Sequence, residues 1–241
     1  MGNKDSKPAN PPGKPVQSPA PGPTVGGSDN RSGPTVSGGG RRKEGVTLYQ
    51  KGLAEKWETV RKRESAYQER CRELGPMHAT TLESLFWLAY AYSQAGDRHT
   101  AVRLVEECYQ GRRQVLGVDH LDTILAQSTM AYMINRVGRC QEALELGEVA
   151  WSKRQRLLGV DHEKTMLAEV LLAYYAHTSG HPDRAVELGE DGFQRRRRVL
   201  GMEHKDTLMA EYLLALYLAS RGQLPQALRV AESSWEKRQR S

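Results

Sequence analysis

Four histidines recur along the 241-residue chain at a step of 42 residues, each shortly after a Leu-Gly pair: His78, His120, His162 and His204. Imidazole nitrogens bind zinc and carry protons in catalysis, so a repeated histidine could build a metal or acid–base site. Zinc needs every ligand nitrogen within ~2.1 Å, whereas packed helices of successive units lie ~8–10 Å apart. The four cannot share one ion. We therefore expect them to make hydrogen bonds in the inter-repeat loops, with no metal and no cofactor.

Other residues that could support catalysis do not form a recognisable set. The sequence contains no nucleophile elbow, no phosphate-binding G-x-x-x-x-G-K-[ST] loop and no Ser/His/Asp grouping. One glutamate also recurs per unit, and we interpret this set as structural: Glu106, Glu148, Glu190 and Glu232. The sequence predicts a protein that is not an enzyme.

The cysteines and the hydropathy indicate the compartment. Cys71, Cys108 and Cys140 are an odd number without a C-x-x-C pair, which is typical of reduced thiols. The sequence contains no apolar run of 18 residues that could span a membrane. Its N-terminus is polar and has no apolar stretch before a cleavage site, so we expect no secretory signal. We expect a cytoplasmic protein.

The 42-residue repeat also defines the helices that must position the recurring histidines and glutamates. An alanine that follows a large apolar residue recurs as Ala89, Ala131, Ala173 and Ala215. A glycine seven residues later suits a helix end: Gly96, Gly138, Gly180 and Gly222. A second alanine opens the next apolar stretch: Ala101, Ala143, Ala185 and Ala227. Each unit is therefore predicted to be a pair of antiparallel helices.

These columns divide the chain into segments. Residues 1–45 hold 8 of the 11 prolines and 10 of the 23 glycines without any aromatic residue, so we expect a disordered tail. Residues 46–73 align in register with the second helix of a repeat unit and are predicted to cap the N-terminal end of the array. Four repeats follow, at 74–115, 116–157, 158–199 and 200–241. No equivalent cap is visible after the fourth repeat, so we expect either that a partner covers this face, such as a second copy in a homo-oligomer, or that the sequence is a truncated member.

The ordered columns, joined by Leu-Gly-x-x-His-x-x-Thr, resemble the tetratricopeptide repeats of the kinesin light chain type over residues 74–241 and in part over 47–73. The resemblance implies an all-α solenoid: a right-handed superhelix whose first helices line a concave groove that binds peptide segments. The chain departs from the family in one column. Where members usually carry Asn before Leu-Ala, it has Trp87, Thr129, Leu171 and Leu213.

If the first helices face inwards, as the resemblance implies, the groove can be mapped onto this sequence, because residues three or four apart share a helix face. One position past each first-helix alanine stand Tyr90, Tyr132, Tyr174 and Leu216. Four residues earlier stand Phe86, Ser128, Val170 and Tyr212, and Gln94, Asn135, Arg136 and His177 lie nearby. This stripe suits a peptide with apolar or aromatic anchors, since Tyr offers contact area and a hydrogen-bonding end. The alternative is that these residues only pack.

Basic residues gather at the end of each second helix, as in Arg112-Arg113 and Arg195–Arg198. Cations at a helix C-terminus interact favourably with the helix dipole, which accounts for them structurally. A strip for nucleic acid is the weaker alternative, because the repeat region carries a net charge of only +2 and no aromatics are interleaved. We expect no nucleic-acid partner.

The tail begins Met1-Gly2-Asn3-Lys4-Asp5-Ser6, which fits the M-G-x-x-x-[ST] acceptor for N-myristoylation at Gly2. One myristoyl chain binds membranes only marginally, so peripheral contact would be reversible. The sequence therefore favours a peptide-binding adaptor with a lipidated tail. An accessory repeat module of a larger sensor, of the fungal immune-receptor-like type, remains an alternative.

Overall fold

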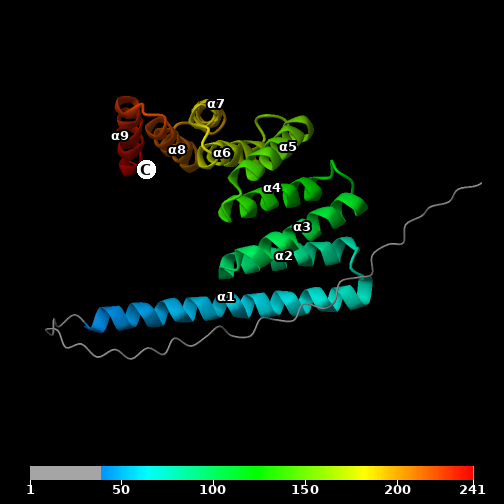
Figure 1. The fold of residues 1–241 in the computed structure, drawn as a ribbon. Helices are drawn as coiled ribbons and strands as arrows, with labels where there is room; N and C mark the ends of the chain where they lie inside the picture. Colours follow the sequence, from blue (N-terminus) through cyan, green and yellow to red (C-terminus); the bar gives the residue numbers. More distant parts are fainter. Residues whose placement is uncertain (1–38, 241) are drawn as a thin grey trace, which may run out of the picture. The chain divides into compact units, whose positions relative to one another are not determined.

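A computed structural model of the chain describes residues 39–240, and these form nine helices without a strand (Figure 1). The helices are α1 (Gly39–Leu74), α2 (Ala79–Ala95), α3 (Arg98–Val115), α4 (Leu121–Arg136), α5 (Cys140–Leu158), α6 (Glu163–Thr178), α7 (Pro182–Leu200), α8 (Lys205–Ser220) and α9 (Leu224–Arg240). Residues 1–38 of the predicted tail lie outside the described residues. Helix α1 starts at Gly39, so residues 39–45 are helical where the sequence analysis placed the end of the tail.

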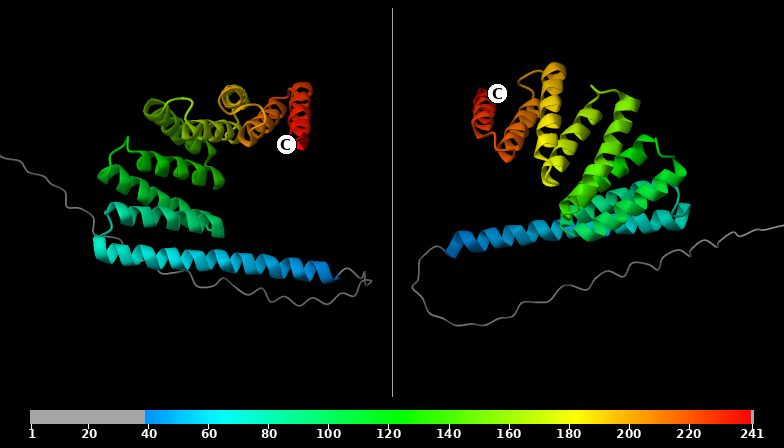
Figure 2. Two further views of the ribbon diagram at one scale, coloured as in Figure 1. Left: turned by 180° about the vertical axis from the view of Figure 1, so that it is seen from behind. Right: turned by 45° about the horizontal axis from the view of Figure 1, so that its top comes forward.

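Consecutive helices pack against one another from α2 to α9, and each repeat is a helix pair: α2 with α3, α4 with α5, α6 with α7 and α8 with α9. The first helices of neighbouring repeats also touch, as α4 does with α6 and α6 with α8. First and second helices therefore alternate along a continuous stack (Figure 2). The packed unit begins at Lys43, and its repeats form the predicted all-α solenoid of helix pairs.

The glycine column ends the first helices as expected. Gly96, Gly138, Gly180 and Gly222 all have positive φ angles, between 83° and 97°. At Gly96 the backbone N–H donates to Ser93 O, and the next residue, Asp97, donates to Tyr92 O. This pattern closes the last turn and reverses the chain, which a residue with a Cβ would do only under strain.

The repeated histidines cap the first helices. In each of them Nδ1 accepts a hydrogen bond from the backbone N–H two residues ahead, at 3.3 Å for His78 and 3.1 Å for the other three. The acceptor satisfies one of the N–H groups that a helix start leaves without an intrahelical partner. The predicted hydrogen-bonding role in the loops is thus confirmed.

Helix α1 lies against the first repeat and covers its apolar side. Val60 is buried, and the Trp57 ring meets Tyr92 of α2 edge-on with the ring centroids 6.0 Å apart. Lower on the same interface, the Thr81 hydroxyl donates to the carbonyl oxygen of Arg70 at 3.3 Å. Apolar area and the Thr81 hydroxyl of α2, which would otherwise face water, are therefore covered by α1.

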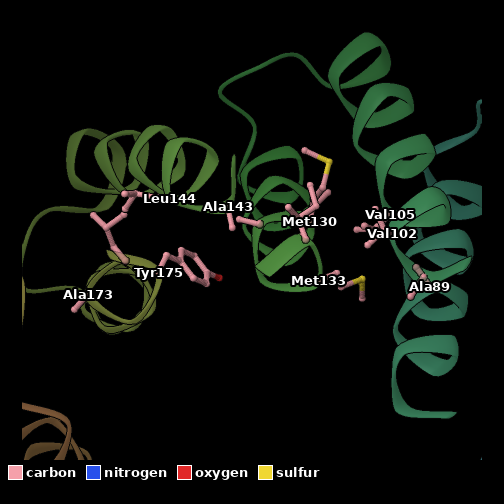
Figure 3. Close-up of a cluster of buried hydrophobic side chains, with 14 of the residues drawn as sticks. Ala89, Val102, Val105, Met130, Met133, Ala143, Leu144, Ala173 and Tyr175 are labelled. Atoms are coloured by element: carbon pink, nitrogen blue, oxygen red, sulfur yellow. The ribbon is translucent and has the colours of Figure 1, made fainter. Parts of the chain in front are cut away.

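A pair of positions with compensating sizes joins each second helix to the next first helix. At Gly147 an added Cβ would lie 2.9 Å from the Tyr175 ring, and at Gly189 it would lie 2.9 Å from the Tyr217 ring. The corresponding residue of α3 is Val105, and there the next first helix carries Met133 instead of Tyr. Figure 3 shows Tyr175 projecting from α6 toward the second repeat and Met133 projecting from α4 toward Val105. Interior packing tolerates little excess volume, so a large ring requires a small partner.

Two carboxylates are buried within repeats three and four. Glu169 accepts from Arg195 Nε at 3.2 Å, and Glu211 accepts from Lys237 Nζ at 2.6 Å. Burial raises the pKa of Glu169, and the Arg195 guanidinium only partly offsets this effect. In the second repeat the same column holds Gln127, whose side-chain amide donates to Leu146 O at 3.5 Å.

The size compensation is testable by overpacking. We expect Gly147→Val to lower the free energy of unfolding by about 1–3 kcal/mol, because its side chain would clash with the Tyr175 ring. Adding Tyr175→Met should recover most of this loss, since the pair then matches Val105 and Met133, and the buried Tyr175 hydroxyl has no hydrogen-bond partner to lose among the described residues. Urea denaturation of the single and double variants measures both effects.

The matched control for this series is Gly52→Val in α1, where an added Cβ meets nothing within 4 Å. Its cost should be smaller than that of Gly147→Val and independent of Tyr175→Met. A double variant no more stable than Gly147→Val alone would contradict the compensation.

The raised pKa of Glu169 predicts a pH dependence. The folded chain holds the Glu169 proton more tightly than the unfolded chain, so this residue lowers the unfolding free energy as the pH rises above the usual carboxyl range, ~4.3. Glu169→Gln removes that loss. We expect the stability of this variant relative to the native chain to increase from pH 4 to pH 7, as measured by urea denaturation at each pH. Arg195→Gln should enlarge the loss of stability at pH 7. If the unfolding free energy of Glu169→Gln falls relative to that of the native chain as the pH rises, the raised pKa of Glu169 is refuted.

Candidate functional site

The predicted groove column is accessible on the first helices. Tyr90, Tyr174 and Leu216 are exposed, and Tyr132 is partly buried beneath the Arg136 guanidinium, which lies 5.7 Å from its ring centroid. These four residues occupy the same position in α2, α4, α6 and α8. One aromatic or aliphatic side chain per repeat is therefore available to a ligand along this face.

The neighbouring predicted column is more varied. Phe86 is only 6% exposed and packs under the Arg112 guanidinium at 4.9 Å from its ring centroid, so it belongs to the core. Ser128 and Val170 are half-buried, and the Ser128 hydroxyl donates to Ile124 O at 2.8 Å within its own helix. Tyr212 is exposed, with Arg238 at 5.3 Å from its ring centroid. The exposed side chain of this column is therefore that of the fourth repeat, Tyr212.

The polar residues predicted for the groove mainly contact residues of the neighbouring first helices. Asn135 is buried, and its side-chain oxygen accepts from the Thr178 hydroxyl at 2.7 Å. Arg136 donates to the Ser93 hydroxyl at 3.2 Å, so both residues bridge adjacent first helices. The His177 ring lies 5.4 Å from that of Tyr217, whereas Gln94 is exposed. Gln94 is thus the polar position most open to a ligand.

The first helices carry a second exposed apolar column that was not predicted from the sequence. Leu125, Leu167 and Met209 stand seven residues before the Tyr132, Tyr174 and Leu216 positions, and all three are exposed. Two helical turns separate the columns, which therefore share a face. Trp87 extends this apolar face in the first repeat, with its ring 6.2 Å from that of Tyr90. The recurrence of these apolar residues at a step of 42 was the sequence signal that could have revealed the column.

Shallow clefts separate the first helices of neighbouring repeats. The cleft between α2 and α4 is lined by Phe86, Trp87, Leu125 and Arg112, and the cleft between α6 and α8 is lined by Leu167, Val170, Met209 and Arg196. Phe86, Arg112 and Leu125 correspond to Val170, Arg196 and Met209 two repeats later. The same design of cleft, with apolar walls and an arginine, is thus built twice.

The arginines of these clefts are buried cations. Arg112 donates to the backbone oxygen of Asp122 at 2.9 Å, and Arg196 donates to that of Met166. Arg154 occupies the same column in the second repeat and makes no hydrogen bond or ion pair with the described residues. Burial lowers the pKa of both Arg154 and Arg196, which reflects the cost of holding a charge away from water.

The other basic residues at the second-helix ends are largely paired within the chain. Arg156 binds Asp119 at 2.9 Å and Arg198 binds Asp161 at 2.5 Å, each reaching back to the loop that precedes its repeat. Arg195 and Lys237 bind the buried glutamates. Because their charges are compensated, these residues support the structural interpretation of the basic clusters rather than a nucleic-acid strip.

The described residues hold no group of three or more histidine, cysteine or carboxylate side chains arranged to bind a metal ion. All three cysteines are unpaired, and burial raises the pKa of the Cys108 thiol to about 11. None of the helices in the described segment is long and apolar enough to cross a membrane.

Comparisons with known proteins agree with this architecture. Two family models described as tetratricopeptide repeat match residues 79–150 and 171–206. No curated protein sequence matches the chain significantly. The crystal structure of a putative kinesin light chain with nearly identical TPR-like repeats from Podosopora anserina has a TM-score of 0.71 at 24% identity, covering 82% of this chain and 94% of that one. Its Q17M form has a TM-score of 0.73 at 25% identity, covering 83% and 96%.

A third structure, BtubC (BKLC) from P. vanneervenii, has a TM-score of 0.67 at 18% identity, covers 76% of this chain and 75% of its own, and shows the shared fold. Both the repeat models and the fold point to one family. The chain therefore carries tetratricopeptide repeats over the matched residues, and its fold is similar to that of the kinesin light chain-like repeat proteins.

Proposed function

We propose that the protein is a non-enzymatic adaptor that binds a segment of another protein along the exposed face of its first helices. The observation that carries this proposal is the double apolar column on that face, from Trp87 and Tyr90 in α2 to Met209 and Leu216 in α8. Exposed apolar patches that run along neighbouring elements typically mark protein interaction sites. Tetratricopeptide repeat proteins generally bind protein partners, which supports the same conclusion.

The side chains of this face define the ligand we expect. Tyr90 and Tyr174 offer large apolar surfaces with a hydroxyl at the rim, which suits aliphatic or aromatic anchor residues. The arginines of the clefts suit a segment that also carries a carboxylate, because Arg112 makes a hydrogen bond to a backbone oxygen but no ion pair within the described residues.

The column that departs from the family favours recognition by side chains. Where related repeats usually carry Asn, this chain has Trp87, Thr129, Leu171 and Leu213, of which Trp87 is exposed and the others are half-buried. None of these four residues has a side-chain amide that could bind a peptide backbone. We therefore propose that apolar anchors, rather than a main-chain clamp, provide most of the affinity.

Binding should depend on the tyrosines of the groove. We expect Tyr132→Ala combined with Tyr174→Ala to weaken binding of peptides selected from a display library on the native chain by more than tenfold, a loss of about 1.4 kcal/mol or more. Fluorescence polarisation with labelled peptides measures the affinity, and thermal melting verifies that the variant is folded.

Val149→Ala is the control for this experiment, since Val149 is exposed on the second helix α5. It should leave the affinity unchanged. Unaltered affinity in the double tyrosine variant, with the fold intact, would exclude this groove as the binding face.

We further propose that the adaptor resides in the cytosol and that Gly2 carries a myristoyl group, which would give the protein a reversible membrane contact. The support is the motif Met1-Gly2 followed by Ser6, in a segment that lies outside the described residues. A single acyl chain supplies a membrane association constant on the order of 10⁴ per molar, so the tether would be weak.

Acylation can be read directly as a mass. After coexpression with an N-myristoyltransferase, we expect the native chain to lose Met1 and to gain the mass of one myristoyl group, whereas Gly2→Ala should gain none. The modified chain should also sediment with lipid vesicles more than the Gly2→Ala variant does. An unmodified Gly2 in the native chain would refute this part of the proposal.

A further inference from the structure

The outer face of α9 carries the most exposed large apolar side chains of the described residues. Leu224 and Trp235 are each 64% exposed and Leu228 is 60% exposed. With Ala231 they form one stripe, because their spacing of four, three and four residues returns to the same side of a helix. This stripe lies on a second helix and is separate from the peptide groove of the first helices.

The corresponding positions in earlier second helices are covered. Leu144 of α5 and Val186 of α7 correspond to Leu228, and both are buried where α6 and α8 pack on them. Phe193 of α7 corresponds to Trp235 and is also buried. The α9 stripe is therefore a continuation of the stacking interface, with the composition of a helix–helix contact.

We propose that this face pairs with the same face of a second copy of the chain, with the two α9 helices antiparallel. The spacing of the stripe is the same in both directions, so an antiparallel pair places Leu224 opposite Trp235 of the second copy and Leu228 opposite Ala231 of the second copy. Each large residue at the centre then meets a small one, which is how packed helices interdigitate. A face that complements itself is the requirement for a two-fold interface.

Charges beside the stripe favour the same arrangement. Arg229 and Glu232 are exposed on the edge of α9 and make no ion pair with the described residues. Antiparallel pairing brings Arg229 of each copy toward Glu232 of the other, giving two symmetric ion pairs. Such pairs at a rim select the orientation more than they add affinity.

Other pairings fit this face less well. Head-to-tail stacking of copies would require the apolar side of α2, which α1 already covers through Val60 and Trp57. A closed pair of copies is consistent with this restriction and has no stacking face that could extend into a fibre.

The proposal is tested by the concentration dependence of mass. One helix stripe is smaller than the ~800 Å² per partner of a standard interface, so we expect a reversible dimer in sedimentation equilibrium over about 1–300 µM. Leu228→Glu should shift the dissociation constant by at least tenfold, and Trp235→Glu should do the same. Leu167→Glu, which changes a residue of similar exposure (58%) in the groove, should leave dimerisation unchanged.

A charge exchange distinguishes the antiparallel pair from non-specific association. Arg229→Glu should weaken the dimer, and Arg229→Glu with Glu232→Arg should restore it. Circular dichroism of each variant confirms folding, which these exposed positions should not disturb. A native chain that remains monomeric to the highest concentration, or a dimer unaffected by Leu228→Glu, would overturn the proposal. A dimer lost in Leu167→Glu would place the contact in the groove instead. The outcome of these dimerisation experiments does not decide whether the groove binds peptides, because peptide affinity is measured separately.

Discussion

The contact between each second helix and the first helix of the next repeat is the interaction on which this molecule depends. No single helix pair can bury both of its apolar sides, so every repeat is stabilised by its neighbours. The interface is matched residue by residue, as the pairs Gly147 with Tyr175 and Val105 with Met133 show. The interface between the second and third repeats and that between the third and fourth use the same Gly–Tyr pair, whereas the first interface exchanges the sizes. Each interface is therefore matched in size by its two partners together.

This stacking determines what remains accessible. Second helices use one side for their own first helix and the other for the next repeat, as α5 does with α4 and α6. First helices retain a free side, and there the exposed apolar residues gather, from Tyr90 to Leu216. The candidate groove and the α9 stripe thus arise from one cause. Both are apolar surfaces of helices that the array itself leaves uncovered, the groove along its length and the stripe on the last helix.

The repeated columns made much of the fold predictable. Glycines such as Gly96 adopt the positive φ that their position implied, and histidines such as His78 make the predicted hydrogen bonds, as helix caps. The start of α1 could not be predicted, since Gly39 and its neighbours lack the apolar periodicity that reveals a helix. Composition favours a coil there. Local propensity and the structure therefore disagree at this boundary, which is the least reliable part of any such prediction.

The candidate site was predictable in outline but not in depth. Spacing placed Phe86 and Tyr90 on one face, yet Phe86 is buried beneath Arg112, a residue from the following helix. Periodicity fixes the direction in which a side chain points from the axis of its helix, whereas burial depends on the rotation and separation of the neighbouring helices. The arginines show the same limit. Their clustering at helix ends suggested exposed cations, but the structure buries Arg112, Arg154 and Arg196, and the first and last of these line clefts between repeats. A buried cation costs free energy unless it is compensated, and the hydrogen bonds of Arg112 and Arg196 to backbone oxygens supply part of that compensation.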